Sequence, residues 1–355
     1  MEKCNICEYE KLILVDFNNI FLRTESKNKN VHDYKNFICK NCGVLNQSPQ
    51  MSEEQLSKYY NSDYRNTGHQ LTFNEKVIDF PLKFDQTGIS FQRFHYFQKI
   101  IEKTNLDIFK KNILDFGSYQ GSFLYACKKF YDSYTIGYDY NDEGLKFSKN
   151  FLEIDEVFKT KDIYSDLFPK KIKICTLIHV FEHLGNPNKF LKHVHKNILE
   201  ENGYIYIEVP DIQSSHYSDP THCFTYSQDS LKYVLEKNDF EILYINNHKI
   251  FGKIDKNIPR RNFQYNLHCL AKKNLKKSFN EFPNQGYKIY IQSKKNHSKV
   301  LNKYILNKTK ELLKDLVELL ITICSRLINY FSSRISISFY EKIKINISKF
   351  LRNFK

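Results

Sequence analysis

The sequence predicts an α/β protein with a doubly wound, mostly parallel sheet, a small cysteine-containing module before it and a helical extension after it. Three observations point to this fold class. Strand-like and helix-like segments alternate between residues 91 and 271, a glycine turn joins one strand to the next helix, and two cysteine pairs stand near the N-terminus. We place the module at residues 1–65, the sheet domain at 66–274, and a basic linker with an amphipathic helical tail at 275–355.

The cysteine pairs predict a metal site. Each C-x-x-C pair aims two sulfurs at one point, and two pairs close a tetrahedral thiolate site that suits Zn²⁺. Alternating Leu12 and Leu14, and then Phe17, Ile20 and Leu22, can form the strands of a zinc ribbon, and Gly43 suits the turn of the second pair. The polar start of the chain does not resemble a secretory signal, which disfavours disulfides and predicts a cytoplasmic protein. We therefore predict a structural, non-catalytic Zn²⁺ on four residues: Cys4, Cys7, Cys39 and Cys42.

The glycine turn lies in residues 112–123, which read N-I-L-D-F-G-S-Y-Q-G-S-F. An apolar run ends in Asp115, and Gly117 and Gly121 precede a helix-compatible segment. This order brings backbone close to a nucleotide-like ligand at the carboxyl end of a strand, and glycine permits the close approach or the positive φ. The dinucleotide fingerprint G-x-G-x-x-G is absent because Tyr119 replaces its second glycine. A purely structural turn in another α/β protein remains the alternative.

Apolar spacing predicts the other elements of the sheet domain. A helix over 91–103 has one apolar face. A strand over 134–139 ends in Asp139. A carboxylate at this place can accept hydrogen bonds from both hydroxyls of a ribose, or it can simply begin the next helix. The remaining predicted elements are helix 122–130, helix 142–151, strand 157–158, strand 172–178, helix 189–199, a turn at Asn202-Gly203, strand 204–210, helix 230–237, strand 240–245 and a last strand over 263–271.

Two of these stretches resemble class I S-adenosylmethionine (SAM)-dependent methyltransferases. The D-x-G-x-x-x-G turn is similar to their first motif, and His179-Val-Phe-Glu-His-Leu184 with Asn186-Pro187 resembles their h-V-L-E-H-L-x-x-P stretch. The resemblance implies a Rossmann-like methyltransferase sheet, an antiparallel last strand and a SAM cofactor. It places Asp162 near the adenine amino group and His179 at the methionine end, whereas Glu182 and His183 either line the site or hold the loop. The cofactor-binding candidates are Asp115, Gly117, Ser118, Gly121, Asp139, Asp162 and His179.

Two further stretches resemble methyltransferases of sugar and surface-polysaccharide pathways. Over about the first 65 residues, the cysteine pairs and the L-x-x-Y-Y-x-x-x-Y segment resemble their zinc-binding leader. The segment His222-Cys-Phe-Thr-Tyr-Ser227 resembles the loop that caps their substrate. An imidazole can take a proton from a hydroxyl or an activated carbon, so His222 is the first candidate for a general base, unless it only orders the loop. Tyr226 and His179 are the other catalytic candidates.

The chain has a net charge of +14, and its whole basic excess lies in the last hundred residues. Residues 1–255 hold 32 Lys and Arg against 35 Asp and Glu, and residues 256–355 hold 22 against 5. Apolar residues that recur every three or four positions from Leu312 predict amphipathic helices. Residues 305–355 can contact an anionic membrane surface peripherally, or they can pack on the sheet domain or on a second subunit in a homodimer.

The sequence therefore predicts SAM-dependent methyl transfer to oxygen or carbon of a sugar, either nucleotide-linked or within a glycan. The expected location is cytoplasmic, with peripheral contact at the inner face of the membrane through the tail. An RNA methyltransferase is the runner-up, because zinc ribbons and basic tails suit phosphates, although the balance of −3 in residues 1–255 argues against nucleic acid. The third reading is a SAM-free, zinc-containing binding protein, suggested by Tyr119 in the turn.

Overall fold

The computed structural model describes residues 2–15, 34–58, 89–212, 221–248 and 266–274, and separate helical positions between 288 and 323. The chain forms two compact units, residues 1–297 and 298–355. Phe17, Ile20 and Leu22, which we expected in the zinc ribbon, lie outside the described residues.

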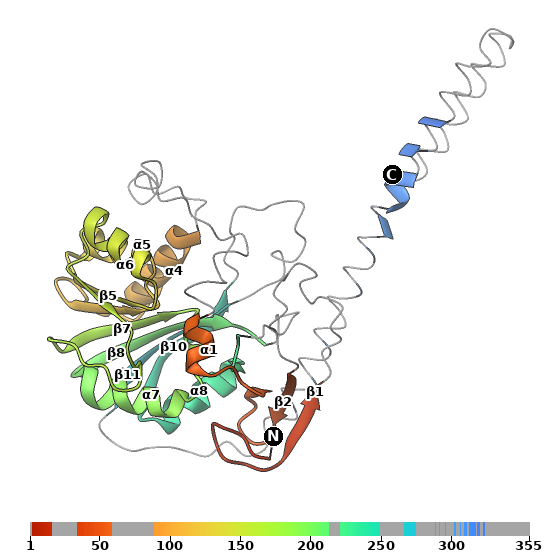
Figure 1. Cartoon of the computed structure of the whole chain (residues 1–355), viewed down its shortest axis with the longest axis horizontal. Helices are drawn as coiled ribbons and strands as arrows, with labels where there is room; N and C mark the ends of the chain where they lie inside the picture. Colours follow the sequence, from red (N-terminus) through yellow and green to blue (C-terminus); the bar gives the residue numbers. More distant parts are fainter. Residues whose placement is uncertain are drawn as a thin grey trace, which may run out of the picture. The chain divides into compact units, whose positions relative to one another are not determined.

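A seven-stranded sheet forms the centre of the first unit, in the order β10-β11-β8-β7-β4-β5-β6 (Figure 1). The strands from β4 to β8 pair in parallel, and β11 runs antiparallel to both β8 and β10. This topology confirms the doubly wound, mostly parallel sheet with an antiparallel last strand. The strand bounds are β4 Asn112–Phe116, β5 Tyr134–Asp139, β6 Glu156–Lys159, β7 Ile172–Ile178, β8 Leu199–Pro210, β10 Phe240–His248 and β11 Asn266–Lys273.

Helices cover both faces of this sheet, because neighbouring strand residues point to opposite sides. Ile113 packs in a cluster with the buried faces of α4, α5 and α6, whereas Leu114 packs in a cluster with those of α7 and α8. In α4 the predicted apolar face (Phe94, Phe97, Ile100 and Ile101) is buried. The helices are α4 Ile89–Lys103, α5 Ser122–Tyr131, α6 Asp142–Phe151, the 3-10 turn η3 Phe181–His183, α7 Pro187–His193, the π-helical turn η4 Val194–Ile198 and α8 Gln228–Lys237.

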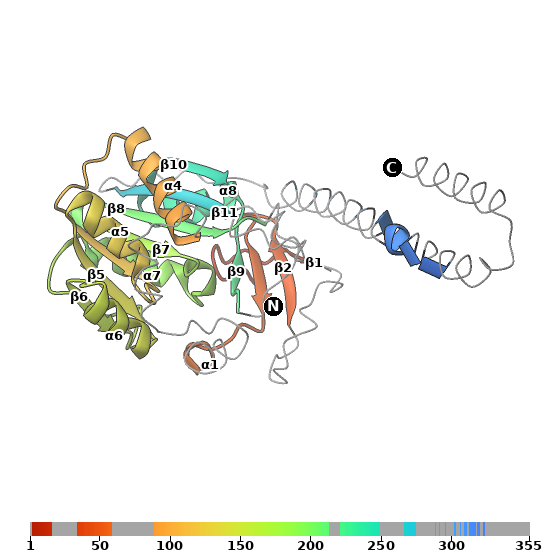
Figure 2. The same cartoon turned by 90° about the horizontal axis from the view of Figure 1, so that it is seen from above.

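A second, four-stranded sheet joins the N-terminal module to the sheet domain (Figure 2). Its order is β1-β2-β3-β9, with β9 supplied by the segment just after His222. Leu45 pairs with Thr225 and Asn46 with Phe224. The module and the loop predicted to cap the substrate therefore form one sheet. Its strands are β1 Leu12–Val15, β2 Lys35–Cys39, β3 Leu45–Ser48 and β9 Phe224–Thr225, and α1 Glu53–Lys58 follows β3 in the chain.

A capping box stands at the start of α1. The main-chain N–H of Ser52 donates to Gln55 Oε1 at 2.8 Å, and the N–H of Gln55 donates to Ser52 Oγ at 3.2 Å.

The expected turn at Asn202-Gly203 is wrong. These residues lie within β8, which begins at Leu199. The register shifts here, so that Ile172 pairs with Leu199 but Ile174 pairs with Tyr204. The extra residues of β8 are taken up as an irregularity in the ladder, and the preceding helix ends earlier than expected, with α7 giving way to η4 after His193.

In the second unit, the described residues are helical. Lys288, Ile291 and Lys295 are helical too, so helical structure reaches into the segment predicted as a linker. Apolar side chains of the second unit are exposed within it: Leu306, Leu312, Leu313, Leu316, Leu319 and Ile323. None of the helices in the described part of the chain is both long enough and apolar enough to cross a bilayer.

Candidate active site

The glycine turn after β4 is built from left-handed backbone. Gly117 has φ +70°, Gly121 has φ +74°, and Tyr119 between them has φ +46°. Tyr119 therefore adopts the conformation that the missing glycine would favour, and its N–H donates to Asp139 Oδ2 at 2.8 Å. A Cβ on Gly117 would lie 2.4 Å from Val180 Cγ2, so the glycine turn packs directly on the H-V-F-E-H-L segment.

Two polar side chains of the turn are buried without a partner. Among the described residues, no group bonds Ser118 Oγ or Gln120 Nε2. A buried polar atom costs free energy until it is hydrogen-bonded, so both atoms fit a polar ligand held at the turn. Asp115 is engaged differently, because the Thr176 hydroxyl donates to its Oδ1 at 2.6 Å and burial raises its pKa to about 7. No pattern in the sequence singled out Gln120.

The two carboxylates predicted to bind ribose and adenine lie at and just beyond the ends of two neighbouring strands. Asp139, at the end of β5, accepts from the N–H groups of Tyr119 and Asn141, and burial raises its pKa. It thus ties the glycine turn to the start of α6. Asp162 follows β6 and is exposed, and the Ser165 hydroxyl donates to it at 2.6 Å, which lowers its pKa. The structure brings Asp139 to the glycine turn, and the ligand roles of both residues remain predictions.

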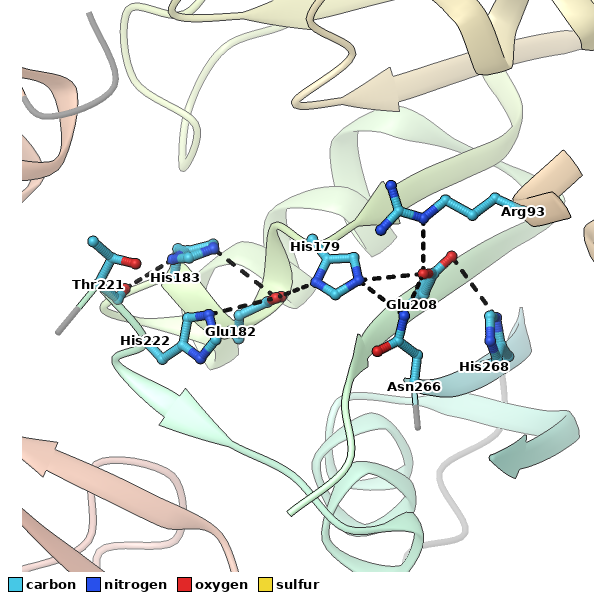
Figure 3. Close-up of polar contacts among 9 residues, drawn as sticks. All are labelled: Arg93, His179, Glu182, His183, Glu208, Thr221, His222, Asn266 and His268. Carbon is cyan, nitrogen blue, oxygen red and sulfur yellow. Dashed lines mark hydrogen bonds and ion pairs between the residues drawn. The ribbon is translucent and has the colours of Figure 1, made fainter. Parts of the chain in front are cut away.

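His179 lies at the end of β7 and bridges two buried carboxylates (Figure 3). Its Nδ1 donates to Glu182 Oε1 at 3.1 Å, and its Nε2 lies 3.2 Å from Glu208 Oε1. Burial and nearby Arg93 act to lower the pKa of His179, but the hydrogen bonds to the two carboxylates raise it above its ordinary value. The residue also has φ +56°, a strained conformation that is common at functional sites. Both ring nitrogens are thus engaged, which favours a holding role over that of a base.

Glu208, on β8, is a centre of the site that the sequence did not reveal. Its side chain is fully buried, and its Oε1 accepts from Arg93 Nε at 3.0 Å and from Asn266 Nδ2 at 2.7 Å. Burial opposes ionisation, but the charge of Arg93 and the hydrogen bond from His179 hold the pKa of Glu208 far below its usual range. A charged residue in the apolar strand Ile-Glu-Val was the only signal available in the sequence.

Two more histidines lie close to Glu182 on the side away from His179. Glu182 Oε1 lies 3.9 Å from His183 Nε2 and 4.0 Å from His222 Nε2, although the histidines come from different segments (Figure 3). The side chains of His183 and His222 are 16% and 15% exposed, whereas that of Glu182 is buried. Tyr226 is fully buried and packs against Phe181, and its hydroxyl has no hydrogen-bond partner among the described residues. Tyr226 therefore lies in the core beneath the cluster.

The four N-terminal cysteines form a separate cluster. Their Sγ atoms lie within 4.8 Å of one another, with 3.7 Å between Cys4 and Cys42 and 3.4 Å between Cys7 and Cys39. Gly43 has φ +73°, and its N–H donates to the Cys39 carbonyl at 3.1 Å, which closes the expected turn.

Comparison with known proteins identifies the central part of the chain. Residues 89–245 match the family model of a methyltransferase domain. Comparison with curated proteins gave no match. Together with the sheet topology, the family match makes this part of the chain a class I SAM-dependent methyltransferase domain with a Rossmann-like fold.

Several solved structures are similar to the chain. A SAM-dependent methyltransferase from Aquifex aeolicus has 18% identity and a TM-score of 0.39, over 50% of this chain and 88% of that one. One from Methanosarcina mazei has 16% identity and a TM-score of 0.39, over 50% and 98%. Geranyl diphosphate C-methyltransferase from Streptomyces coelicolor has 10% identity and a TM-score of 0.41, over 49% and 74%.

Proposed function

We propose that the enzyme transfers a methyl group from SAM to oxygen or carbon of a sugar or glycan-type acceptor. The observation that carries the proposal is the meeting of His222 with Glu182 just beyond the end of β7. That strand end neighbours the end of β4, where the glycine turn begins. A cofactor site and a group able to accept a proton therefore share one edge of the sheet.

SAM, when bound, supplies an electrophilic methyl group on a sulfonium. The residues at the glycine turn fit this cofactor: Gly117 leaves no room for a side chain, and Ser118 and Gln120 offer buried polar atoms for its amino-acid end. Asp139 and Asp162 would face its ribose and adenine, and Asp115 and Gly121 would shape the turn. The task of these residues is positioning, which supplies most of the catalysis in a displacement reaction.

The acceptor hydroxyl must lose a proton as it is methylated. His222 is the side chain best placed to take that proton, because buried Glu182 would stabilise the resulting imidazolium from 4.0 Å. His179, held between two carboxylates, would keep Glu182 in place.

The acceptor class is supported by the second sheet. Because β9 follows His222 and pairs with β3, the N-terminal module fixes one end of the segment that carries His222. A module with this sequence pattern resembles the leader of sugar-pathway methyltransferases. The net charge of −3 over residues 1–255 gives this part of the chain no excess of positive charge with which to attract RNA.

Labelled SAM distinguishes the acceptors. We would incubate the full chain with a panel of sugar nucleotides and, separately, with total RNA, and measure label transfer. The proposal predicts transfer to a sugar nucleotide that is reduced in His222→Gln and retained in His95→Gln, a matched control at an exposed position of α4. Transfer to RNA alone would overturn the acceptor assignment.

We also propose that the four N-terminal thiolates hold a structural Zn²⁺. With Zn–S bonds of about 2.3 Å, the sulfurs of a tetrahedral site stand about 3.8 Å apart. The Cys4–Cys42 and Cys7–Cys39 separations of 3.7 and 3.4 Å fit this spacing. Four thiolates leave no open position, so this metal would stabilise the module and take no part in the chemistry.

For the tail, we propose contact with anionic membrane surfaces. The exposed leucines of the second unit and the excess of basic residues in 256–355 together support an in-plane helix on such a surface. This contact would bring the enzyme to membrane-linked glycan intermediates.

A further inference from the structure

We propose that Glu182, His183 and His222 bind a divalent transition-metal cation. The observation is geometric: one ligand atom from each residue lies within 4.8 Å of the other two. Two imidazoles and one carboxylate form a donor set that suits divalent first-row metals and leaves coordination positions open. The site is separate from the four-cysteine cluster.

The buried carboxylate provides a second, independent observation. Glu182 is 1% exposed, and no group among the described residues bonds its Oε2. Its Oε1 has one hydrogen bond, from His179, and two longer contacts with the imidazoles of His183 and His222. A carboxylate this deeply buried requires compensation for its charge, and a cation bound between it and the two imidazoles would supply it.

His183 is oriented as a metal ligand. Its Nδ1 lies 2.8 Å from the Thr221 carbonyl oxygen, and because a carbonyl only accepts, Nδ1 carries the hydrogen. In the neutral ring, the lone pair is then on Nε2, the atom that faces Glu182. Metal-binding histidines are commonly fixed through their second nitrogen in this way. Because Thr221 precedes His222, the segment that supplies one ligand also orients the other.

The spacing of the ligand atoms allows closure around an ion. At metal–ligand distances of about 2.1 Å, neighbouring ligands stand roughly 3.0–3.4 Å apart. Nε2 of His183 and Nε2 of His222 lie 3.9 and 4.0 Å from Glu182 Oε1. Movements of under about 1 Å by the two rings would therefore complete the site.

The consequence for the reaction depends on the proposed function. A hydroxyl oxygen bound to the cation would lose its proton to water more readily, as metal-bound water does. His222 would then be a ligand, and its role as general base would apply only to the metal-free protein.

The test measures Mn²⁺ binding to the full, zinc-containing chain. The electron paramagnetic resonance signal of free Mn²⁺ reports how much of the metal is unbound. Mn²⁺ prefers carboxylate oxygen to thiolate sulfur, so in the zinc-containing chain it reports on this site and not on the cysteines. We expect one bound Mn²⁺ per chain. Loss even of an outer-shell partner weakens metal binding roughly 10- to 100-fold, so we expect a loss of at least about 100-fold in Glu182→Gln and in His222→Gln. His95→Gln should bind like the wild type.

Absence of Mn²⁺ uptake by the wild type up to about 1 mM, or wild-type uptake by both variants, would overturn the proposal. If Glu182→Gln does not fold, His222→Gln carries the test, because its side chain is partly exposed.

Methyl transfer measured with EDTA and with added Mn²⁺ separates the two proposals. Transfer unaffected by EDTA would overturn the metal's role and leave His222 as the base. Absence of transfer to any sugar under either condition, with Mn²⁺ still bound, would overturn the proposed function alone.

Discussion

Substitution of Gly117 by alanine tests the contact between the glycine turn and the H-V-F-E-H-L segment. The new Cβ would lie 2.4 Å from Val180 Cγ2, and the residue would have to keep φ +70°. The left-handed conformation costs an L-residue about 1–2 kcal/mol, and overpacking costs about 1–3 kcal/mol. We therefore expect Gly117→Ala to lower the free energy of unfolding by about 2–5 kcal/mol.

Val180→Ala separates the two contributions. It removes the methyl group that the new Cβ meets, so in the double variant the steric part, about 1–3 kcal/mol, should be recovered while the backbone part remains. Urea unfolding of the four proteins measures both, with Val180→Ala alone as the control. A Gly117→Ala variant within about 0.5 kcal/mol of the wild type, or a double variant with no recovery, would refute this packing.

Three other predictions concern the metal, a buried carboxyl group and the tail. Cys39→Ser should lose the equimolar zinc and unfold at a lower temperature, whereas Cys127→Ala, outside the cluster, should keep the metal by elemental analysis. Burial raises the pKa of Asp115 from 3.8 to about 7, so between these pH values the folded state keeps a carboxyl proton that the unfolded state has lost. The free energy of unfolding of the wild type therefore falls as pH rises through that window, by up to about 4 kcal/mol. The stability of Asp115→Asn relative to the wild type, measured by urea unfolding, should therefore be greater at pH 8 than at pH 4. An equal difference in stability at both pH values would contradict the raised pKa as its cause. Deletion of residues 305–355 should abolish co-sedimentation with anionic vesicles at low salt, with neutral vesicles as the control, and no binding of the full chain would remove the membrane proposal.

Local patterns predicted most of the sheet domain. The apolar run before Asp115 and the spacing of Phe94 and Phe97 depend on nearest neighbours along the chain, so strand and helix could be assigned from them. The Asn202-Gly203 prediction failed because a turn signal is local, whereas the pairing of β8 with β7 takes up those residues in the ladder. The two-residue strand β9 is too short to show a period at all.

The site could be predicted only in part. Asp139 and the glycines stand at strand ends, which periodicity locates, and their proximity follows from parallel pairing of β4 with β5. The ion pair of Arg93 with Glu208 joins residues 115 positions apart, and Asn266 completes it from the antiparallel strand. Partners at such separations have no local signature. Similarly, His222 was singled out as a base, but its meeting with Glu182 required the fold.

The central claim, that the glycine turn holds SAM, is tested most directly by isothermal titration of the full chain with SAM. We predict saturable binding of one SAM per chain, weakened in Gly117→Ala and in Asp139→Ala while circular dichroism shows both variants folded. No heat of binding from folded wild-type protein, or equal affinity in both variants, would contradict the claim.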